Sequence, residues 1–236
     1  FGYLIKETDP LPPLTLHEKI LKLADSTTLL PLLRGQFDED QYPGFDPKSI
    51  DMSNSCGQAV IATLANIYSS LNMDKRKITI SDVLKLMNGK SGQMTHGEMN
   101  AVLKKMGKET ELFDVVDNMT YFQEQKLIPL SEWNYVVERS RNEVFKKAGI
   151  LVAFVLQYGR RPITKQGDVQ GHFVAISGDK LLILDPRGGI NNTAQVLNVS
   201  LENYSQPFIN REFGLLSIQA VVPRSLGRPR GESSVY

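Results

Sequence analysis

The sequence contains little cysteine and histidine, and it lacks a long apolar stretch. Its 236 residues include one cysteine and three histidines. A single cysteine cannot form an internal disulfide, which favours a reducing cytoplasm, in the cell of origin or in a host cell, over an oxidising compartment. No run reaches the roughly 18–20 consecutive apolar residues that cross a bilayer, so we expect no membrane span.

The charges are balanced, and no metal or phosphate motif is recognisable. Lys and Arg number 27 against 26 Asp and Glu, which gives a net charge of +1. This balance provides no bulk attraction to nucleic acid, so we expect no nucleic-acid partner. The histidines have no cysteine or second histidine at ligand spacing, and "PRGG" at 186–189 lacks the Lys-Ser/Thr of a P-loop. We therefore expect neither a metal nor another cofactor, and the sequence does not indicate an oligomeric state.

The sequence predicts one folded domain with an arm at each end. Hydrophobic residues make up 41% and charged residues 22%, which is typical of globular proteins. The segment "DPLPPL" predicts an extended arm at 1–14, and the polar "PRSLGRPRGESSVY" predicts a flexible tail near 224–236. Between them, residues 15–223 are expected to form the domain. The chain begins with Phe1 rather than Met, so we expect natural residues to precede it.

Helical patterns come first along the chain and strand patterns second. Apolar residues at helical spacing, some behind capping-box pairs such as Thr95 and Glu98, predict helices at 15–24, 56–71, 81–89, 95–107 and 131–149. Apolar, partly β-branched runs predict strands at 150–157, 172–177, 180–185 and 215–222. Residues 34–55 are expected to form a long loop, of the kind often found beside a site. The order indicates an α+β fold, with N-terminal helices packed on a C-terminal antiparallel sheet.

The single cysteine stands where a predicted helix begins, in "MSNSCGQAVIATLANIY". Ser53, Asn54 and Ser55 are all favourable N-cap residues, so the helix is expected to start at about Cys56. The helix dipole and the unpaired N–H groups lower the pKa of a thiol there and could hold a developing oxyanion. Gly57 leaves room for a substrate to approach. Cys56 is therefore a candidate nucleophile, although most free cysteines are only small buried residues.

His172 is the candidate base because it lies in a predicted hairpin, "GHFVAISGDKLLILDPRGG" (171–189). With a two-residue type II′ turn at "GD", His172 is directly opposite Asp185 on the same face of the sheet. A carboxylate there can accept the Nδ1–H of the imidazole, fix its tautomer and stabilise the imidazolium. Because Pro186 ends the strand, Asp185 is expected at an open rim.

The remaining histidines and a basic loop are weaker candidates. His17 and His96 fall in predicted helices, at positions expected to face solvent. Arg160 and Arg161 lie in the loop that leads to His172. A solvated turn is the default interpretation of this loop, and a basic rim that faces the substrate is the alternative.

Three motifs together resemble papain-fold cysteine peptidases: "SCGQAVIATLANIY", "GQMTHGEMNAVLKKMG" and "GHFVAISGDKLLILDPRGG". Their order and spacing are most similar to the branch that includes the bacteriocin-processing, double-glycine-leader peptidases. The resemblance spans most of the expected domain. It implies a papain-like fold, with Cys56 as nucleophile, His172 as general base and Asp185 as the residue that orients the imidazole.

One position departs from that family. Its members usually have a glutamine six residues before the cysteine, whose amide helps to form the oxyanion hole, whereas this chain has Ile50. Asn54 is the nearest amide that could substitute, and Gln36 or Gln41 could fold back from the long loop. Altered oxyanion residues occur on similar folds among secreted effector proteases, protein deamidases and transglutaminase-like enzymes.

The leading hypothesis is a cysteine protease that hydrolyses a peptide or protein substrate through an acyl-enzyme. In one form of this hypothesis, the protease is a secreted effector. A glutamine deamidase or transglutaminase is the first alternative, because it would use the same triad on a side-chain amide. A peptidase-like binding module that has lost activity is the second, and Ile50 favours it. The sequence alone does not separate the protease from the deamidase.

Overall fold

The computed structural model describes residues 26–71, 77–106, 110–117, 150–158, 169–177, 182–187, 192–198 and 215–223. The predicted arm, the tail, the helices at 15–24 and 131–149, His17, Arg160 and Arg161 lie outside these residues. The helical elements, with η for a 3-10 helix, are α2 (Ser26–Leu29), η1 (Leu30–Leu32), η2 (Glu39–Gln41), η3 (Pro47–Ser49), η4 (Met52–Asn54), α3 (Cys56–Leu71), α4 (Ile80–Leu86) and α5 (His96–Lys105). The strands are β1 (Thr110–Asp117), β2 (Ile150–Tyr158), β3 (Val169–Ser177), β4 (Leu182–Asp185), β5 (Gln195–Leu197) and β6 (Leu215–Pro223).

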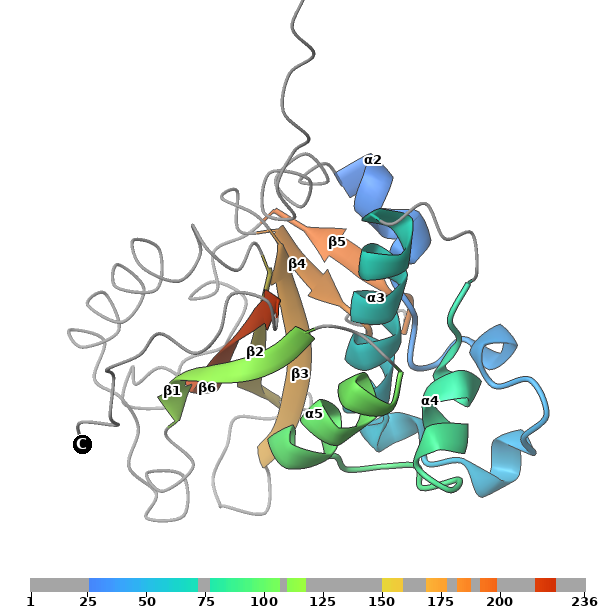
Figure 1. Ribbon diagram of the computed structural model, residues 1–236. Coiled ribbons are helices and arrows are strands. Elements are labelled where there is room, and N and C mark those ends of the chain that lie inside the picture. Colours follow the sequence, from blue (N-terminus) through green and yellow to red (C-terminus); the bar gives the residue numbers. More distant parts are fainter. Residues whose placement is uncertain are drawn as a thin grey trace, which may run out of the picture.

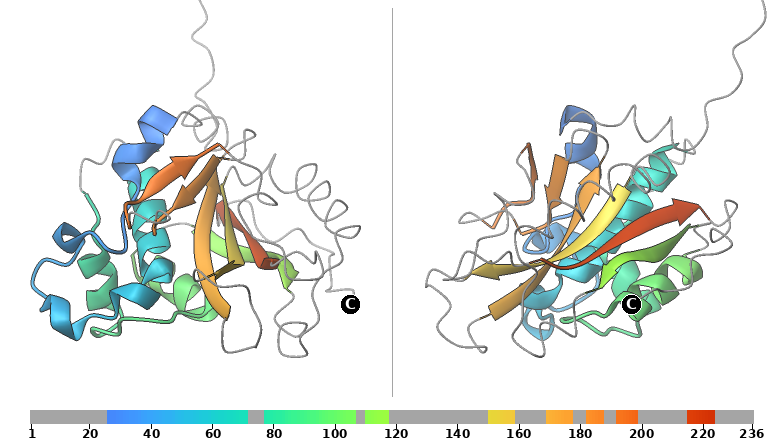
Figure 2. Two further views of the ribbon diagram at one scale, coloured as in Figure 1. Left: turned by 180° about the vertical axis from the view of Figure 1, so that it is seen from behind. Right: turned by 90° about the vertical axis from the view of Figure 1, so that its left-hand side faces the viewer.

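The described strands form a six-stranded sheet in the order β1-β6-β2-β3-β4-β5, and every neighbouring pair is antiparallel. Helices α3, α4 and α5 lie on the same side of it (Figure 1), and α3 packs along β3 (Figure 2). The predicted α+β class, with helices packed on an antiparallel sheet, is confirmed. The four predicted strands are also confirmed, with ends that shift by a few residues.

The sequence patterns miss the two edge strands, β1 and β5. β1 follows α5 within the predicted helical half of the chain and pairs with β6, more than 90 residues later. Its sequence "TELFDVVD" does not alternate between apolar and polar residues, so the usual strand signal is absent. β5 has only three residues, all half-buried. An edge strand pairs with a neighbour on one side only. Here these two strands form through pairing with distant segments, which a local sequence pattern does not record.

Helix α3 lies at the centre of the packing. The pattern predicts one buried face, whereas every residue from 56 to 69 is buried. The reason is that α3 contacts β3 on one side and α4, α5 and η1 on others. Apolar side chains of the helix and the sheet fill these contacts, among them Ile61, Leu64, Ile67, Val152, Phe173 and Leu184. Such a central helix holds its first residue in a fixed place relative to the strands.

One polar side chain inside this packing, Asn66, is hydrogen-bonded to the backbone at three points. Asn66 of α3 donates from Nδ2 to the carbonyl oxygens of Ala62 and Ile78, each at 2.8 Å, and its Oδ1 accepts from the N–H of Ile78. Its side chain therefore fastens α3 to the segment that enters α4. Buried polar groups with such partners avoid the cost of desolvation.

Capping boxes begin helices α4 and α5. Thr95 and Glu98 exchange the expected hydrogen bonds at the start of α5, which confirms the predicted box. α4 begins at Ile80, one residue earlier than predicted from Ser81, because Thr79 and Asp82 form a capping box of their own. Among the described helices, none is long and apolar enough to cross a membrane.

Candidate active site

The start of α3 places Cys56 against the sheet. The short 3-10 helix η4 leads into Ser55, whose carbonyl accepts from the N–H of Ala59 and so begins the helical ladder. Cys56 is the first residue of α3, as the N-cap pattern predicts. Its side chain is 7% exposed and not part of any disulfide. The backbone N–H of Phe173, in β3, donates to Sγ at 3.5 Å.

The His172 and Asp185 side chains form a buried pair. His172 Nε2 lies 2.8 Å from Asp185 Oδ1, and the two residues are 2% and 1% exposed. The same carboxylate oxygen accepts the backbone N–H of Arg187 at 2.8 Å. The predicted pairing of these side chains is therefore present, but through Nε2 rather than Nδ1. An imidazole has two ring nitrogens, so Nδ1 remains to face the thiol.

The strand register differs by two residues from the predicted one. Ala175 pairs with Leu184, whereas the two-residue turn would pair it with residue 182. β3 ends at Ser177 and β4 begins at Leu182, so the connection is longer than two residues. Strand side chains alternate between faces with a period of two, so a shift of two leaves each residue on its expected face. His172 and Asp185 thus remain neighbours, now diagonally across the two strands.

Asp185 does not stand at an open rim. The prediction of a rim depended on Pro186 ending the strand, and β4 does end at Asp185. However, the loop residue Gln36 packs beside this end, and its backbone N–H donates to the carbonyl of Pro186 at 2.8 Å. The long loop thereby closes the site next to the carboxylate.

Contacts with His172 and with the backbone determine the acidity of the thiol. Burial raises the pKa of Cys56, but the hydrogen bond and charge of His172 and the N–H groups of Phe173 and Gly57 outweigh it, and the pKa lies below its ordinary value. Burial lowers the pKa of His172, but the hydrogen bonds and charges of Asp185 and Cys56 outweigh it and raise that pKa to about 9. These opposite directions favour a thiolate beside an imidazolium at neutral pH.

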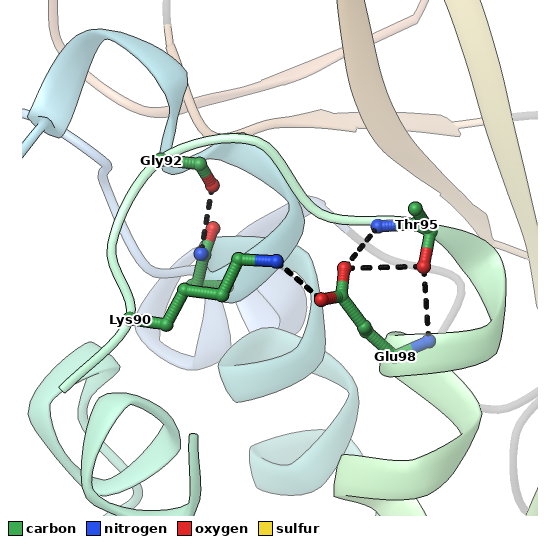
Figure 3. A network of polar contacts seen from close by, with 5 residues as sticks. Lys90, Gly92, Thr95 and Glu98 are labelled. Carbon is green, nitrogen blue, oxygen red and sulfur yellow. Dashed lines mark hydrogen bonds and ion pairs between the residues drawn. The ribbon is translucent and has the colours of Figure 1, made fainter. Parts of the chain in front are cut away.

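The loop before α5 is hydrogen-bonded to the first turn of α3, and Figure 3 shows the polar contacts of this loop. Gln58 donates from Nε2 to the carbonyl of Gly92 at 2.8 Å, and Lys90 forms an ion pair with Glu98 at the start of α5. Met94, which is 7% exposed, follows in the same loop. A Cβ on Gly57 would lie 2.9 Å from Met94 Cβ. The space at Gly57 that the sequence assigns to substrate is therefore occupied by Met94.

The amides proposed to replace the family glutamine have other partners. Asn54 is exposed, and its Nδ2 donates to Asp51 Oδ2 at 2.8 Å. Gln41 Nε2 is 3.3 Å from Asp38 Oδ2. Gln36 does fold back toward the cysteine, but it is fully buried and donates to the carbonyls of Met52 and Ser53. In this arrangement the backbone N–H groups at the start of α3 are the remaining candidates for holding an oxyanion.

The sequence patterns do not predict that Tyr42 is buried beside the site. This residue is 2% exposed and donates its hydroxyl hydrogen to the carbonyl of Gln36 at 2.6 Å. Burial raises its pKa well above the ordinary value, and the nearby Cys56 adds to that rise. Tyr42 lies in an irregular loop, where no periodic pattern marks a buried residue. Among the described residues, no cluster of three or more His, Cys, Asp or Glu side chains could hold a metal ion.

Comparisons with known proteins find similarity among solved structures alone. No family model matches the sequence, and no curated protein matches it. Among solved structures, the peptidase domain of Streptococcus ComA, a bifunctional ABC transporter involved in a quorum-sensing pathway, is similar to this chain. It shares 21% sequence identity, with a TM-score of 0.38, over 77% of this chain and 96% of that domain.

Proposed function

We propose that the protein is a cysteine peptidase that hydrolyses a peptide bond in a peptide or protein substrate. The observation that carries this proposal is that the helix-start thiol of Cys56 lies beside the buried His172–Asp185 pair. Its Sγ accepts the N–H of Phe173, the residue after His172, and His172 lowers its pKa. Nucleophilic catalysis by cysteine needs a base within hydrogen-bond reach and a group that orients the base. Cys56, His172 and Asp185 supply these three parts in that order.

The proposed reaction forms and then hydrolyses a thioester. The thiolate of Cys56 attacks the carbonyl carbon of the scissile bond, and the carbonyl electron pair moves onto oxygen. As the C–N bond breaks, the imidazolium of His172 gives its proton to the leaving amine. Neutral His172 then takes a proton from water, whose oxygen attacks the thioester. The acid product leaves, and the thiolate and imidazolium are restored.

The other groups of the site would support these steps. Asp185 holds the Nε2–H of His172, which keeps the ring in one orientation and stabilises its positive charge during the reaction. The Phe173 N–H stabilises the thiolate between turnovers. The first backbone N–H groups of α3 would stabilise the oxyanion, aided by the positive end of the helix dipole.

A peptide library analysed by mass spectrometry tests the proposal. Wild-type protein is expected to cleave some library members, and Cys56→Ala and His172→Gln are expected to cleave none. His96→Gln, at the start of α5, is the matched control and is expected to retain cleavage. Thermal unfolding of all variants would show that the loss does not come from misfolding. Cleavage by Cys56→Ala at the wild-type rate would contradict the assignment.

The same data address the alternative functions. A deamidase would leave the peptide chains intact and convert glutamine to glutamate, which changes the peptide mass in a characteristic way. A peptidase-like binding module that has lost activity would yield neither cleaved nor deamidated peptides. Its Cys56 would react with iodoacetamide no faster than a free thiol at neutral pH. Either result would replace the peptidase proposal.

A further inference from the structure

Gln36 connects the segment before Cys56 with the end of the strand that carries Asp185. Its side-chain Nε2 donates to the carbonyl oxygens of Met52 at 3.1 Å and Ser53 at 3.2 Å, both in η4. Its backbone N–H donates to the carbonyl of Pro186, the residue after Asp185, at 2.8 Å. One fully buried residue therefore bridges the two parts of the candidate site.

The orientation of the Gln36 amide follows from its partners. Two carbonyl oxygens face Nε2, and a carbonyl can only accept hydrogen bonds. Exchanging the amide oxygen and nitrogen would place oxygen against both carbonyls, which is repulsive. The NH₂ group must therefore point at η4, where it donates to both carbonyls.

Tyr42 holds the bridge from its other side. The hydroxyl donates to the carbonyl oxygen of Gln36 at 2.6 Å, and it lies near Ser55, directly before Cys56. The backbone N–H, the backbone carbonyl and the side-chain NH₂ of Gln36 thus all have partners. Such an interlocked set of buried hydrogen bonds restricts movement of its members relative to one another.

We propose that Gln36 is a positioning residue, which fixes the thiol of Cys56 relative to the His172–Asp185 pair by bridging η4 and Pro186. This inference rests on the proposed function and deepens it. Groups of an active site must be held within about 0.5 Å of their productive geometry by the residues around them. The attraction between thiolate and imidazolium falls with distance, so loosening the bridge weakens the activation of the thiol.

This role differs from that of the glutamine in the family motif. An oxyanion donor touches substrate and leaves the acidity of the thiol unchanged when it is removed. Gln36 is 0% exposed and its N–H groups are engaged, so it acts through the position of Cys56. The pH dependence of thiol reactivity in the absence of substrate distinguishes the two roles.

The experiment measures the rate of alkylation of Cys56 by iodoacetamide as a function of pH. The chain has one cysteine, so every alkylation event reports on this thiol. The titratable groups that face it are His172 from β3, with Asp185 behind, and Tyr42 from the loop. All of them are retained in Gln36→Met, which has a side chain of similar length without hydrogen-bond donors. A change in the profile therefore reports the geometry.

Asn66→Leu provides a matched control. Like Gln36, Asn66 has a buried side-chain amide that donates to two carbonyl oxygens. It lies in α3, ten residues after Cys56 and about 15 Å along the helix. In Gln36→Met we expect the midpoint of the alkylation profile to rise by about one pH unit, so that the rate falls about tenfold at pH values below both midpoints. In Asn66→Leu we expect a lower melting temperature and an unchanged midpoint.

The outcomes separate this inference from the proposed function. One outcome is a wild-type thiol that titrates below its ordinary pKa and gives the same alkylation profile as the thiol of Gln36→Met. That result would overturn the positioning role of Gln36 alone. A wild-type thiol that titrates at the ordinary value would overturn both proposals. Where Gln36→Met does not fold, Tyr42→Phe decides, because it loosens Gln36 by removing one hydroxyl. Its midpoint is expected to rise by a smaller amount, and an unchanged midpoint would again count against the bridge.

Discussion

His172 Nε2 and Asp185 Oδ1 lie 2.8 Å apart although the two residues are not opposite each other in the β3–β4 ladder. The ladder pairs Ala175 with Leu184, which leaves His172 and Asp185 diagonal. Diagonal neighbours on one sheet face remain within reach of long side chains. The contact is also shielded from solvent, because both side chains are almost fully buried.

Asp185→Asn tests what the carboxylate charge contributes. The amide oxygen of asparagine can still accept the Nε2–H, so ring orientation is retained while the stabilising charge is lost. We expect the pKa of His172 to fall by about one to three units, since an opposite charge at this distance has effects of that size. Titration of the imidazole followed by NMR measures the change. An unchanged imidazole pKa would show that the carboxylate charge does not support the imidazolium.

The pH dependence of kcat/KM follows from the two shifted pKa values. The thiol pKa is lowered, so the thiolate forms below the ordinary range, and the imidazole pKa is raised to about 9. The active thiolate–imidazolium pair therefore exists between these values and is lost as the pH rises through about 9. We expect a bell-shaped profile with its alkaline limb there, measured with a peptide found in the library screen. Activity that keeps rising above that limb would contradict the ion-pair assignment.

The features of the site that the sequence predicts depend on periodicity and on local capping. The small polar residues before Cys56 locate the helix start, since they signal an N-terminus independently of the rest of the fold. The shared face of His172 and Asp185 is predicted correctly even with the wrong turn length, because the period of two tolerates a shift of two. The choice of ring nitrogen depends on side-chain torsions, which no pattern records.

Features that depend on irregular chain segments could not be predicted in this way. Gln36 and Tyr42 lie in a loop without a repeating pattern, so their burial beside the site comes only from tertiary packing. The same loop turns the expected rim at Asp185 into a buried position. Gly57 could be interpreted as space for substrate or for a neighbouring side chain, and the sequence does not distinguish these.

Gly57→Ala tests the close packing of Met94 on α3. The added Cβ would lie 2.9 Å from Met94 Cβ, which is closer than a normal contact. Overpacking of this kind costs about 1–3 kcal/mol, and the better helix propensity of alanine offsets only about 1 kcal/mol. We expect a net loss in the free energy of unfolding, measured by urea denaturation.

Gly97→Ala in α5 is the control for that variant. The nearest atom to its added Cβ is Thr95 Oγ1, at 4.0 Å, so there is space for a methyl group. Only the propensity gain remains, and we expect unchanged or slightly increased stability. Equal stability changes in the two glycine variants would show that Met94 does not restrict the first turn of α3.

Asn54→Ala tests whether an amide beside the nucleophile stabilises the oxyanion. An oxyanion donor would make its removal lower kcat by roughly 10²–10³, with little change in KM. In the structure, however, Asn54 is exposed and its Nδ2 is engaged with Asp51. We therefore expect kcat near the wild-type value and a stability loss within about 0.5 kcal/mol, as for other surface positions. Steady-state kinetics and urea denaturation of the same preparation provide both numbers. A large fall in kcat at unchanged stability would mean that the Asn54 side chain turns from Asp51 toward the substrate during catalysis.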